Sequence, residues 1–443
     1  MSAPRRWSRR RLLQAFAALG AGAFGLGPTQ PLHARPRQKR ATGARVVVIG
    51  GGAGGATAAR YLKHFGPEID VTLVEPSSSY ATCFGGNWYL AGLRSLDALR
   101  HGYEALSGHA GVRVVHDTAQ GWDADRGIVH LGGGGRLRYD RLVVAPGIDF
   151  RWDEVDGLRP DDAERIPHAW KGGAGYRHLR DQVRAMDDGD TVAICTPPVP
   201  FRCPPGPYER ASLLAHYLKH HKPRSKVLRL DAEFGFSKQG LFEEGWSALY
   251  PEHMERIPGS KGGRLERVDA ATRRVWTEQG STPFRPAVLN VIPPQWAGAI
   301  ARRMDLTDET GWCPVEPEGF ESTRQGGVHV LGDAAIAGAM PKSAHSANSQ
   351  AKVVAAALVA ALRGREAPPA RLVNTCYSLL APDYGISIAG VYAPAGGTIE
   401  EIGGGVSPEA DRDFRRREAA YARGWYRAIT DEIYGTAGEF PES

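Results

Sequence analysis

The stretch from Arg45 to Glu75 constrains the fold of this chain more than any other, because it matches the start of a dinucleotide-binding α/β unit. Arg45 to Ile49 is a short β-branched run, which predicts a strand buried on both faces. Gly50, Gly52 and Gly55 follow at Gly-x-Gly-x-x-Gly spacing. The first glycine permits a tight turn, the second lets a pyrophosphate approach the backbone, and the third lets a helix pack close to the strand.

The residues after this turn complete the predicted unit. A helix is expected from Ala56 to Phe65, and its free N–H groups and positive dipole end would stabilise a phosphate. The second strand, Val71 to Val74, ends at Glu75, which is placed to accept hydrogen bonds from a ribose 2′-hydroxyl. The sequence therefore predicts that the three glycines and Glu75 bind a dinucleotide.

The N-terminal segment has the pattern of an export signal. Ser8-Arg9-Arg10-Arg11-Leu12-Leu13 precedes a weakly apolar, glycine-rich run to Leu26, and Ala34 offers a small residue for cleavage. A membrane anchor would need about 18 or more consecutive apolar residues, and this run is too short. We expect residues 1–34 to be a cleaved twin-arginine signal that directs the protein to the periplasm, with no integral membrane segment in the mature chain.

The charge balance and the cysteine spacing exclude other classes of function. Removing residues 1–34, which hold five arginines and no acidic residue, lowers the formal net charge from +6 to +1. Five more basic residues precede Val46, so the fold itself is slightly acidic and a nucleic-acid partner is not expected. The five cysteines include no Cys-x-x-Cys-His for haem attachment and no spacing that indicates a zinc site, so no metal is predicted.

Two later segments are typical of a flavin-binding domain. The apolar run Arg141 to Val144 ends in Ala145-Pro146-Gly147, a turn common where flavoprotein reductases leave the FAD domain. Gly332-Asp333 follows an apolar strand in the manner of the second FAD fingerprint, with the aspartate expected on the ribityl chain. Lys342 is a further candidate cofactor-binding residue. The helix expected from Ser343 to Leu362 would direct its N-terminus at the isoalloxazine, or else be a plain core helix.

The middle of the chain indicates a second Rossmann-like unit that binds no nucleotide. Its first strand, Thr191 to Cys195, is followed by a proline-rich segment from Thr196 to Pro207 where a glycine turn would stand. Proline has no N–H to donate to a phosphate. Asp231 closes the next strand in the place of a ribose ligand, and without the glycine turn we interpret it as structural.

From Arg45 to the C-terminus the chain resembles the flavoprotein subunit of flavocytochrome c sulfide dehydrogenase. The resemblance is carried by five strings, namely Glu75-Pro76 before Tyr80-Ala81-Thr82-Cys83, Arg202-Cys203-Pro204-Pro205-Gly206-Pro207-Tyr208-Glu209-Arg210-Ala211-Ser212, Gly311-Trp312-Cys313-Pro314-Val315, Met340-Pro341-Lys342-Ser343 and Asn374-Thr375-Cys376-Tyr377-Ser378. It implies an α/β fold with two Rossmann-like three-layer domains of the FAD/NAD(P)-dependent disulfide reductase type and a small C-terminal interface domain.

The expected domains follow from these boundaries. They are a signal peptide at 1–34, the first part of the FAD-binding domain at 43–152, a second Rossmann-like domain without an intact nucleotide loop at 153–287, the second part of the FAD-binding domain at 288–365, and a C-terminal cytochrome-interface domain at 370–443.

The resemblance also implies roles for single residues. Cys83 would carry FAD through an 8α-cysteinyl thioether, and Cys203 and Cys376 would form a redox-active disulfide beside the flavin. Cys203 precedes a predicted helix N-terminus, where a thiolate is stabilised. Glu209 either handles protons near the sulfur or simply favours the first turn of that helix. Cys195 and Cys313 are interpreted as buried structural thiols.

The expected function is oxidation of sulfide at the disulfide, with electrons passing through FAD to a c-type cytochrome subunit that holds the haem. Trp425 and Tyr426 on the final helix are candidate contacts with that partner, although aromatic residues at that spacing are as often core residues. One alternative is a flavoprotein like sulfide:quinone oxidoreductase, against which the charged run Asp411 to Glu418 argues. Another alternative is a flavin-bearing component of a sulfur-oxidation complex that does no catalysis.

Overall fold

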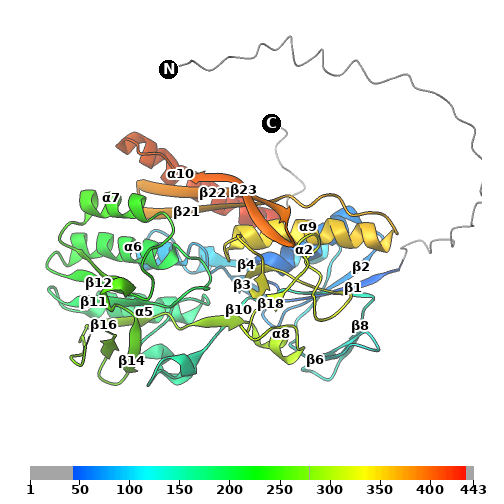
Figure 1. Ribbon diagram of the computed structural model, residues 1–443, viewed down its shortest axis with the longest axis horizontal. Coiled ribbons are helices and arrows are strands. Elements are labelled where there is room, and N and C mark those ends of the chain that lie inside the picture. The colour runs from blue at the N-terminus through cyan, green and yellow to red at the C-terminus, as the bar shows by residue number, and fades with distance from the viewer. Residues whose placement is uncertain (1–42, 279, 436–443) are drawn as a thin grey trace, which may run out of the picture. The chain divides into compact units, whose positions relative to one another are not determined.

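The computed structural model describes residues 43–278 and 280–435, and the expected signal at residues 1–34 lies outside them (Figure 1). The first part is a parallel five-stranded sheet. In spatial order its strands are β19 (Val328–Val330), β9 (Arg141–Val144), β1 (Arg45–Ile49), β2 (Asp70–Val74) and β5 (Arg113–Val115). Val46 and Val48 of β1 join one core cluster and Val47 and Ile49 another, because successive side chains of a strand point to opposite faces of the sheet.

Two helices cover one face of this sheet. They are α2 (Ala53–Phe65) and α9 (Ala344–Leu362), which pack against each other and against Val46 and Val48. Helix α2 begins at Ala53, three residues before the predicted start. The difference arises because Gly54 and Gly55 have helical backbones here although glycine is a poor helix former, which hides the start of the helix from a reading of the sequence.

The second part is a parallel sheet of four strands. In spatial order they are β13 (Met254–Ile257), β12 (Lys226–Asp231), β11 (Thr191–Thr196) and β16 (Val288–Val291). Three helices belong to this half of the chain, namely α5 (Ala174–Ala185), α6 (Gly206–His221) and α7 (Gln239–Leu249). Of these, α5 and α6 pack against strands of the sheet. The hairpin of β14 (Leu265–Asp269) and β15 (Arg274–Thr277) contributes to the separate core cluster on the other face. The predicted second Rossmann-like unit is therefore observed.

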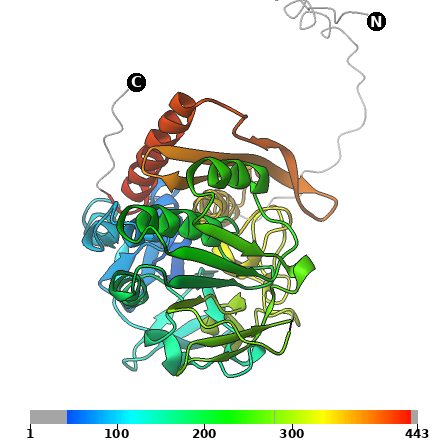
Figure 2. The ribbon, with the colours of Figure 1, turned by 90° about the vertical axis from the view of Figure 1, so that its left-hand side faces the viewer.

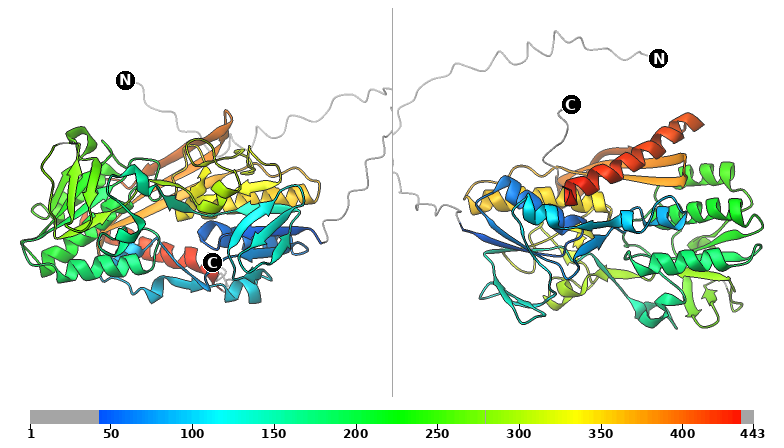
Figure 3. Two further views of the ribbon diagram at one scale, coloured as in Figure 1. Left: turned by 90° about the horizontal axis from the view of Figure 1, so that it is seen from below. Right: turned by 180° about the vertical axis from the view of Figure 1, so that it is seen from behind.

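The third part joins the other two. It is an antiparallel sheet of β21 (Leu372–Ala381), β22 (Tyr384–Ala395) and β23 (Thr398–Val406), followed by α10 (Arg412–Tyr434) (Figure 2). Strand β21 packs against both α6 and α9, and α10 packs on β22 and reaches α2 (Figure 3).

Backbone N–H groups on alternate residues of β21 donate to side chains of both halves. These bonds run from Val373 to Ser349 Oγ at 3.0 Å, from Thr375 to His345 Nδ1 at 2.7 Å and from Leu379 to Glu209 Oε1 at 2.9 Å. An edge strand normally exposes such groups, so these contacts hold β21 in one register between the two halves.

Shorter elements complete the fold. The crossing segments β10 (Ile148–Phe150) and β17 (Gln295–Ala297) pair antiparallel between the two halves. The others are β3 (Ser79–Ala81), α3 (Gly86–Leu90), β4 (Arg100–Gly102), α4 (Glu104–Gly108), β6 (Ala119–Asp123), β7 (Ile128–Leu131), β8 (Arg136–Arg138), α8 (Ala299–Arg303), β18 (Cys313–Pro314) and β20 (Ala335–Ile336).

The described residues pack as one compact unit, and the domain boundaries inferred from the sequence stay predictions. Within 43–278 and 280–435, no helix combines the length and the apolar character that crossing a bilayer requires.

A buried ion pair fastens α10 to the rest of the fold. Arg415 is fully buried and contacts Glu418 at 3.1 Å and Glu244 of α7 at 3.4 Å. Ser387 of β22 donates a further hydrogen bond to Glu418 at 2.7 Å. Because both members of the pair lie away from water, each charge depends on the other for its stabilisation.

Replacing Arg415 by Met should destabilise the protein by about 3–5 kcal/mol, because the Glu418 carboxylate would stay buried without a cation. A fall in the thermal midpoint of unfolding would measure this loss. The double variant Arg415→Met/Glu418→Gln removes both charges and should recover most of it. Equal midpoints for the single and double variants would contradict this account.

Candidate active site

The glycine turn between β1 and α2 has the geometry that its spacing predicts. Gly50 has a left-handed backbone (φ 100°), and an added Cβ would lie 2.3 Å from the carbonyl oxygen of Ala145. A Cβ at Gly55 would lie 1.9 Å from the carbonyl oxygen of Gly50, so only glycine lets α2 pack this closely. A Cβ at Gly52 would first meet the ring of Tyr80, at 3.5 Å, so the backbone at Gly52 has room beside it.

A cavity of about 920 Å³ lies against this turn, and we call it the glycine-turn cavity. No side chain caps the N-terminus of α2, so its first N–H groups are available to a phosphate. Six residues that the sequence analysis assigned to the cofactor line this cavity, namely Gly50, Gly52, Glu75, Cys83, Gly332 and Asp333.

The two carboxylates of this cavity fit a dinucleotide that carries hydroxyl groups. Glu75 accepts hydrogen bonds from the N–H groups of Gly51 at 2.9 Å and Ser77 at 3.0 Å, which fix it at the end of β2. Asp333 is almost fully buried, and its Oδ1 has no partner among the described residues. Burial raises the pKa of Asp333, whereas Arg202 and Lys342 oppose that rise. An acceptor oxygen without a donor suits the hydroxyl groups of a ribityl chain, so these residues fit FAD.

Lys342 contacts the predicted cofactor residue Asp333 but does not line the glycine-turn cavity. Its ammonium donates to the carbonyl oxygens of Asp333 at 2.8 Å and Ala335 at 2.9 Å and lies 3.9 Å from the centre of the Trp312 ring. Burial lowers the pKa of Lys342 to about 8. Its side chain lines a separate cavity together with Trp312 and Met340. At the glycine-turn cavity, α9 contributes Ala344 and its N-cap residue Ser343 instead.

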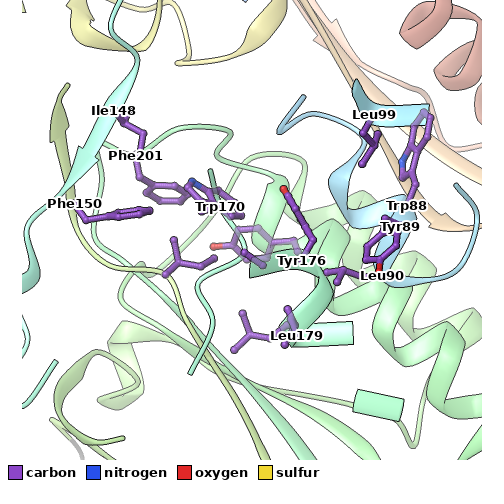
Figure 4. Close-up of a cluster of buried hydrophobic side chains, with 14 of the residues drawn as sticks. Trp88, Tyr89, Leu90, Leu99, Ile148, Phe150, Trp170, Tyr176, Leu179 and Phe201 are labelled. Atoms are coloured by element: carbon purple, nitrogen blue, oxygen red, sulfur yellow. The ribbon is translucent and has the colours of Figure 1, made fainter. Parts of the chain in front are cut away.

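A second cavity, of about 770 Å³, contains the predicted catalytic residues, and we call it the cysteine cavity. Cys83, Arg202, Ser343 and Ala344 line both cavities, so the two adjoin there. Aromatic side chains form much of its wall, and Figure 4 shows two of them, Trp170 and Tyr176, within a buried cluster. The residues from the sequence analysis that line it are Cys83, Cys203, Glu209, Cys376 and Trp425.

Cys203 and Cys376 come together although 172 residues separate them in the sequence. Cys203 lies in the loop before α6, has a left-handed backbone (φ 57°), and donates its N–H to the carbonyl oxygen of Lys342 at 2.7 Å. Cys376 lies on β21. Both are thiols in the structure and are hydrogen-bonded to each other. The other two cysteines, Cys195 and Cys313, are buried thiols as predicted.

The structure places the more acidic thiol on Cys376 rather than on Cys203. The hydrogen bond from Cys203 and then the nearby ammonium of Lys238 lower the pKa of Cys376 to about 7, against burial and the charge of Glu209. The same hydrogen bond and burial raise the pKa of Cys203. Cys203 lies just before α6, and stabilisation of its thiolate by the N-terminus of that helix stays a prediction.

Glu209 lies in the first turn of α6 and also lines the cysteine cavity. Its carboxylate accepts hydrogen bonds from Asn87 at 2.8 Å, Trp88 at 3.2 Å and the N–H of Leu379 at 2.9 Å. Burial raises the pKa of Glu209, while these bonds oppose the rise. Glu209 thus stands in the first turn of α6, links α3 to β21 and lines the cavity of the cysteines, and its handling of protons stays a prediction.

Lys238 is a charged residue of this site that the sequence analysis missed. It precedes α7, is 6% exposed, and donates to the carbonyl oxygen of Cys376 at 3.0 Å and to Ser378 Oγ at 2.8 Å. No motif marks it, since a single lysine before a helix is common. Of the two alternatives for Tyr426, the core residue is the one observed, because its side chain is 1% exposed.

The second α/β half has no room for a ribose where Asp231 ends β12. The carboxylate of Asp231 is fully buried and contacts Arg229 at 3.0 Å, Arg256 at 2.9 Å and the hydroxyl of Tyr208 at 2.9 Å. Phe236 stacks on Tyr208 with ring centres 3.5 Å apart. The structural interpretation of Asp231 is confirmed, because protein groups occupy its acceptor positions.

Three family descriptions match parts of the chain. "Sulfide dehydrogenase [flavocytochrome c] flavoprotein chain, central" matches residues 177–293. "Flavocytochrome c sulphide dehydrogenase, flavin-binding" matches residues 368–434. "Pyridine nucleotide-disulphide oxidoreductase" matches residues 44–181. Together they span both α/β halves and the C-terminal part.

Two kinds of protein are similar in sequence, namely a flavocytochrome c flavoprotein chain and sulfide:quinone oxidoreductases. The flavoprotein chain of flavocytochrome c sulfide dehydrogenase from Chlorobaculum thiosulfatiphilum is 59% identical over 39 residues, which are 9% of this chain and 81% of that one. The mitochondrial sulfide:quinone oxidoreductase of Dictyostelium discoideum is 24% identical over 337 residues, which are 71% of this chain and 70% of that one.

Solved structures show the fold. The sulfide:quinone oxidoreductase of Aquifex aeolicus has a TM-score of 0.68 at 15% identity, covering 90% of this chain and 94% of that one. The NAD-dependent persulfide reductase from A. fulgidus has a TM-score of 0.60 at 17% identity, covering 86% and 77%. The predicted α/β fold of the FAD-dependent disulfide reductase type is thereby confirmed.

Proposed function

Since the chain belongs to the family of flavocytochrome c sulfide dehydrogenase flavoproteins, we propose that it oxidises sulfide at Cys203 and Cys376 and passes the electrons through FAD to a c-type cytochrome. The broader activity, that of a flavin-dependent sulfide oxidoreductase, follows from the family. The observation that carries the finer proposal is the meeting of the two cysteines in a cavity that adjoins the glycine-turn cavity at Cys83.

The chemistry at the cysteines is thiol–disulfide exchange with hydrosulfide as the attacking thiolate. In the oxidised protein Cys203 and Cys376 form a disulfide. Hydrosulfide attacks one of its sulfurs, the S–S bond breaks, and a new S–S bond forms to the incoming sulfur. The bonding electron pair leaves on the other cysteine as a thiolate, so sulfide is oxidised and the disulfide is reduced.

FAD, when bound, supplies an acceptor that takes two electrons and can release them one at a time. The glycine turn and the N-terminus of α2 would hold its pyrophosphate, while Glu75 would hold the adenosine ribose and Asp333 the ribityl chain. Cys83 lines both cavities and would form the thioether. The aromatic wall of the cysteine cavity, including Trp170, keeps water from the reacting sulfur.

Replacing Cys203 by Ser should leave FAD bound but slow its reduction by sulfide by about a thousandfold or more, because no disulfide can then form. Cys376→Ser should slow it to a similar extent, since the two residues act as a unit. Anaerobic stopped-flow absorbance of the flavin measures the rate. Cys195→Ala, which removes a buried thiol outside the cavity, should keep the wild-type rate. Rapid bleaching of the flavin by sulfide in Cys203→Ser would contradict this mechanism.

Acid precipitation should leave the flavin attached to the wild-type protein and release it from Cys83→Ser, because only a thioether survives unfolding in acid. Flavin absorbance in the supernatant and the mass of the peptide that contains Cys83 measure the attachment. The Cys195→Ala protein serves again as the matched control and should retain its flavin. If the wild-type flavin also appears in the supernatant, the linkage does not exist.

The family match favours a cytochrome as the electron acceptor. The similarity to sulfide:quinone oxidoreductases favours a quinone instead. The charges of α10 near its start are largely neutralised within the chain, by contacts of Arg412 and Arg416 with Asp383 and of Arg415 with Glu418. A docking surface is therefore better sought at Trp425, which is half-buried beside the cysteine cavity, and at the exposed Tyr421 one turn earlier.

With sulfide as the electron donor, the purified protein should reduce a c-type cytochrome at least tenfold faster than it reduces a water-soluble ubiquinone analogue. Faster reduction of the quinone would instead assign the protein as a sulfide:quinone oxidoreductase. Haem and flavin absorbance at equal acceptor concentrations measure the two rates, and Cys203→Ser is the matched blank for both. Co-purification of a haem protein from the periplasm would support both the partner and the proposed export by the twin-arginine route.

A further inference from the structure

Lys238 is a buried cation that donates its hydrogen bonds to two neutral acceptors. Its side chain is 94% removed from solvent, and its ammonium bonds to the carbonyl oxygen of Cys376 and the hydroxyl of Ser378. Within 43–278 and 280–435, no carboxylate lies within ion-pair distance of it. Burying a charge without a counter-charge is costly, so this position calls for an anion nearby.

The backbone at Lys238 adds to that cost. Its φ of 63° lies in the left-handed region that favours glycine. The carbonyl group of Lys238 accepts the first turn's hydrogen bond from Phe242, so the residue also begins α7. Neither the backbone conformation nor the helix start requires a lysine, so its ammonium must be explained by what it faces.

Four titratable groups, on three elements and one loop, act electrostatically on Lys238. They are Cys376 on β21, Cys203 before α6, Glu209 on α6 and Glu418 on α10. Glu209 and Glu418 are already bonded to other donors, Glu209 to Asn87 and Trp88 and Glu418 to Arg415. Cys376 is the group whose backbone Lys238 touches, and its sulfur carries a charge only when the cysteine pair is open.

We propose that Lys238 is a positioning residue that provides the counter-charge for anionic sulfur on Cys376 whenever the bond between Cys203 and Cys376 is broken. This inference rests on the proposed function, because that function opens the pair. In the closed disulfide the lysine keeps only the two carboxylates, which are already bonded to other donors. In the open pair, a negative charge stands on the residue whose carbonyl oxygen the ammonium already contacts at 3.0 Å. Lys238 thus favours the reduced form of the pair over the oxidised form.

The acidity of Cys376 agrees with this role. Its pKa is lowered to about 7, first by the hydrogen bond from Cys203 and then by Lys238. Burial lowers the pKa of Lys238, and the neighbouring sulfur and carboxylate groups oppose that change. Each charge therefore supports the other inside a region of low dielectric.

The test substitutes Lys238 by Gln, which keeps a hydrogen-bond donor and removes the charge. In the reduced holoprotein, alkylation of Cys376 by iodoacetamide across pH, read by peptide mass spectrometry, should rise through about pH 7 in the wild type. In Lys238→Gln the midpoint should move upward, so that labelling at pH 7 is about tenfold slower. Lys238→Arg should restore the profile. Lys222→Gln, which removes a lysine bonded to the carbonyl group of Met186, should leave it unchanged.

A second readout follows the disulfide itself. In a glutathione redox buffer at pH 8, the ratio of open to closed Cys203–Cys376 pair should fall about tenfold in Lys238→Gln, equal to about 30 mV. Ser378→Ala removes one hydrogen-bond acceptor of the Lys238 ammonium. It should shift the alkylation midpoint and the redox ratio in the same direction as Lys238→Gln but to a smaller extent. If Lys238→Gln does not fold, the Ser378→Ala variant tests the role of Lys238 in its place.

Unchanged alkylation and redox profiles in Lys238→Gln would overturn the role of Lys238. Absence of any Cys203–Cys376 disulfide in the oxidised wild type would instead overturn the proposed function, while the alkylation profile still reports on Lys238. The two failures are therefore distinguishable.

Discussion

The position of β21 between the two α/β halves is the constraint on which the site depends. Its N–H groups bond to Ser349 and His345 of α9 on one side and to Glu209 of α6 on the other. A buried donor left without a partner costs about 1–3 kcal/mol, and a slip of one residue would unpair all three. The same slip would turn Cys376 to the opposite face of the strand. The backbone register of one strand thereby fixes the distance between two sulfurs.

Around those sulfurs the structure balances charges that it has removed from water. Arg202 faces Asp333 at the junction of the two cavities, and Lys238 faces Cys376. In an interior of low dielectric each such charge acts over a longer range than it would at the surface. A reaction that moves an electron pair from one sulfur to another can therefore be directed by a single ammonium or carboxylate.

The sequence predicted the parts of this arrangement that local pattern encodes. Spacing identified Gly50, Gly52 and Gly55, and the missing glycine turn correctly indicated that Asp231 is structural. Resemblance supplied Cys203 and Cys376. Lys238 escaped notice because its burial is created by β21, about 140 residues later in the chain. The direction of the Lys342 side chain was missed as well, because no motif encodes its contacts with the carbonyl oxygens of Asp333 and Ala335 or with the ring of Trp312.

The ionic cluster at the end of β12 bears on whether a pyridine nucleotide can bind to this protein. Arg229, Arg256 and Tyr208 fill the acceptor positions of Asp231, and the preceding loop is proline-rich. Restoring a glycine turn alone would leave two arginines against an incoming adenosine ribose, and removing them would leave a buried carboxylate without a partner. A pyridine nucleotide would thus meet neither a glycine turn nor a free ribose acceptor at this strand end, and these features interlock, since any one of them is costly to reverse alone. Under the proposed function, electrons taken from sulfur have no pyridine-nucleotide acceptor at this strand end.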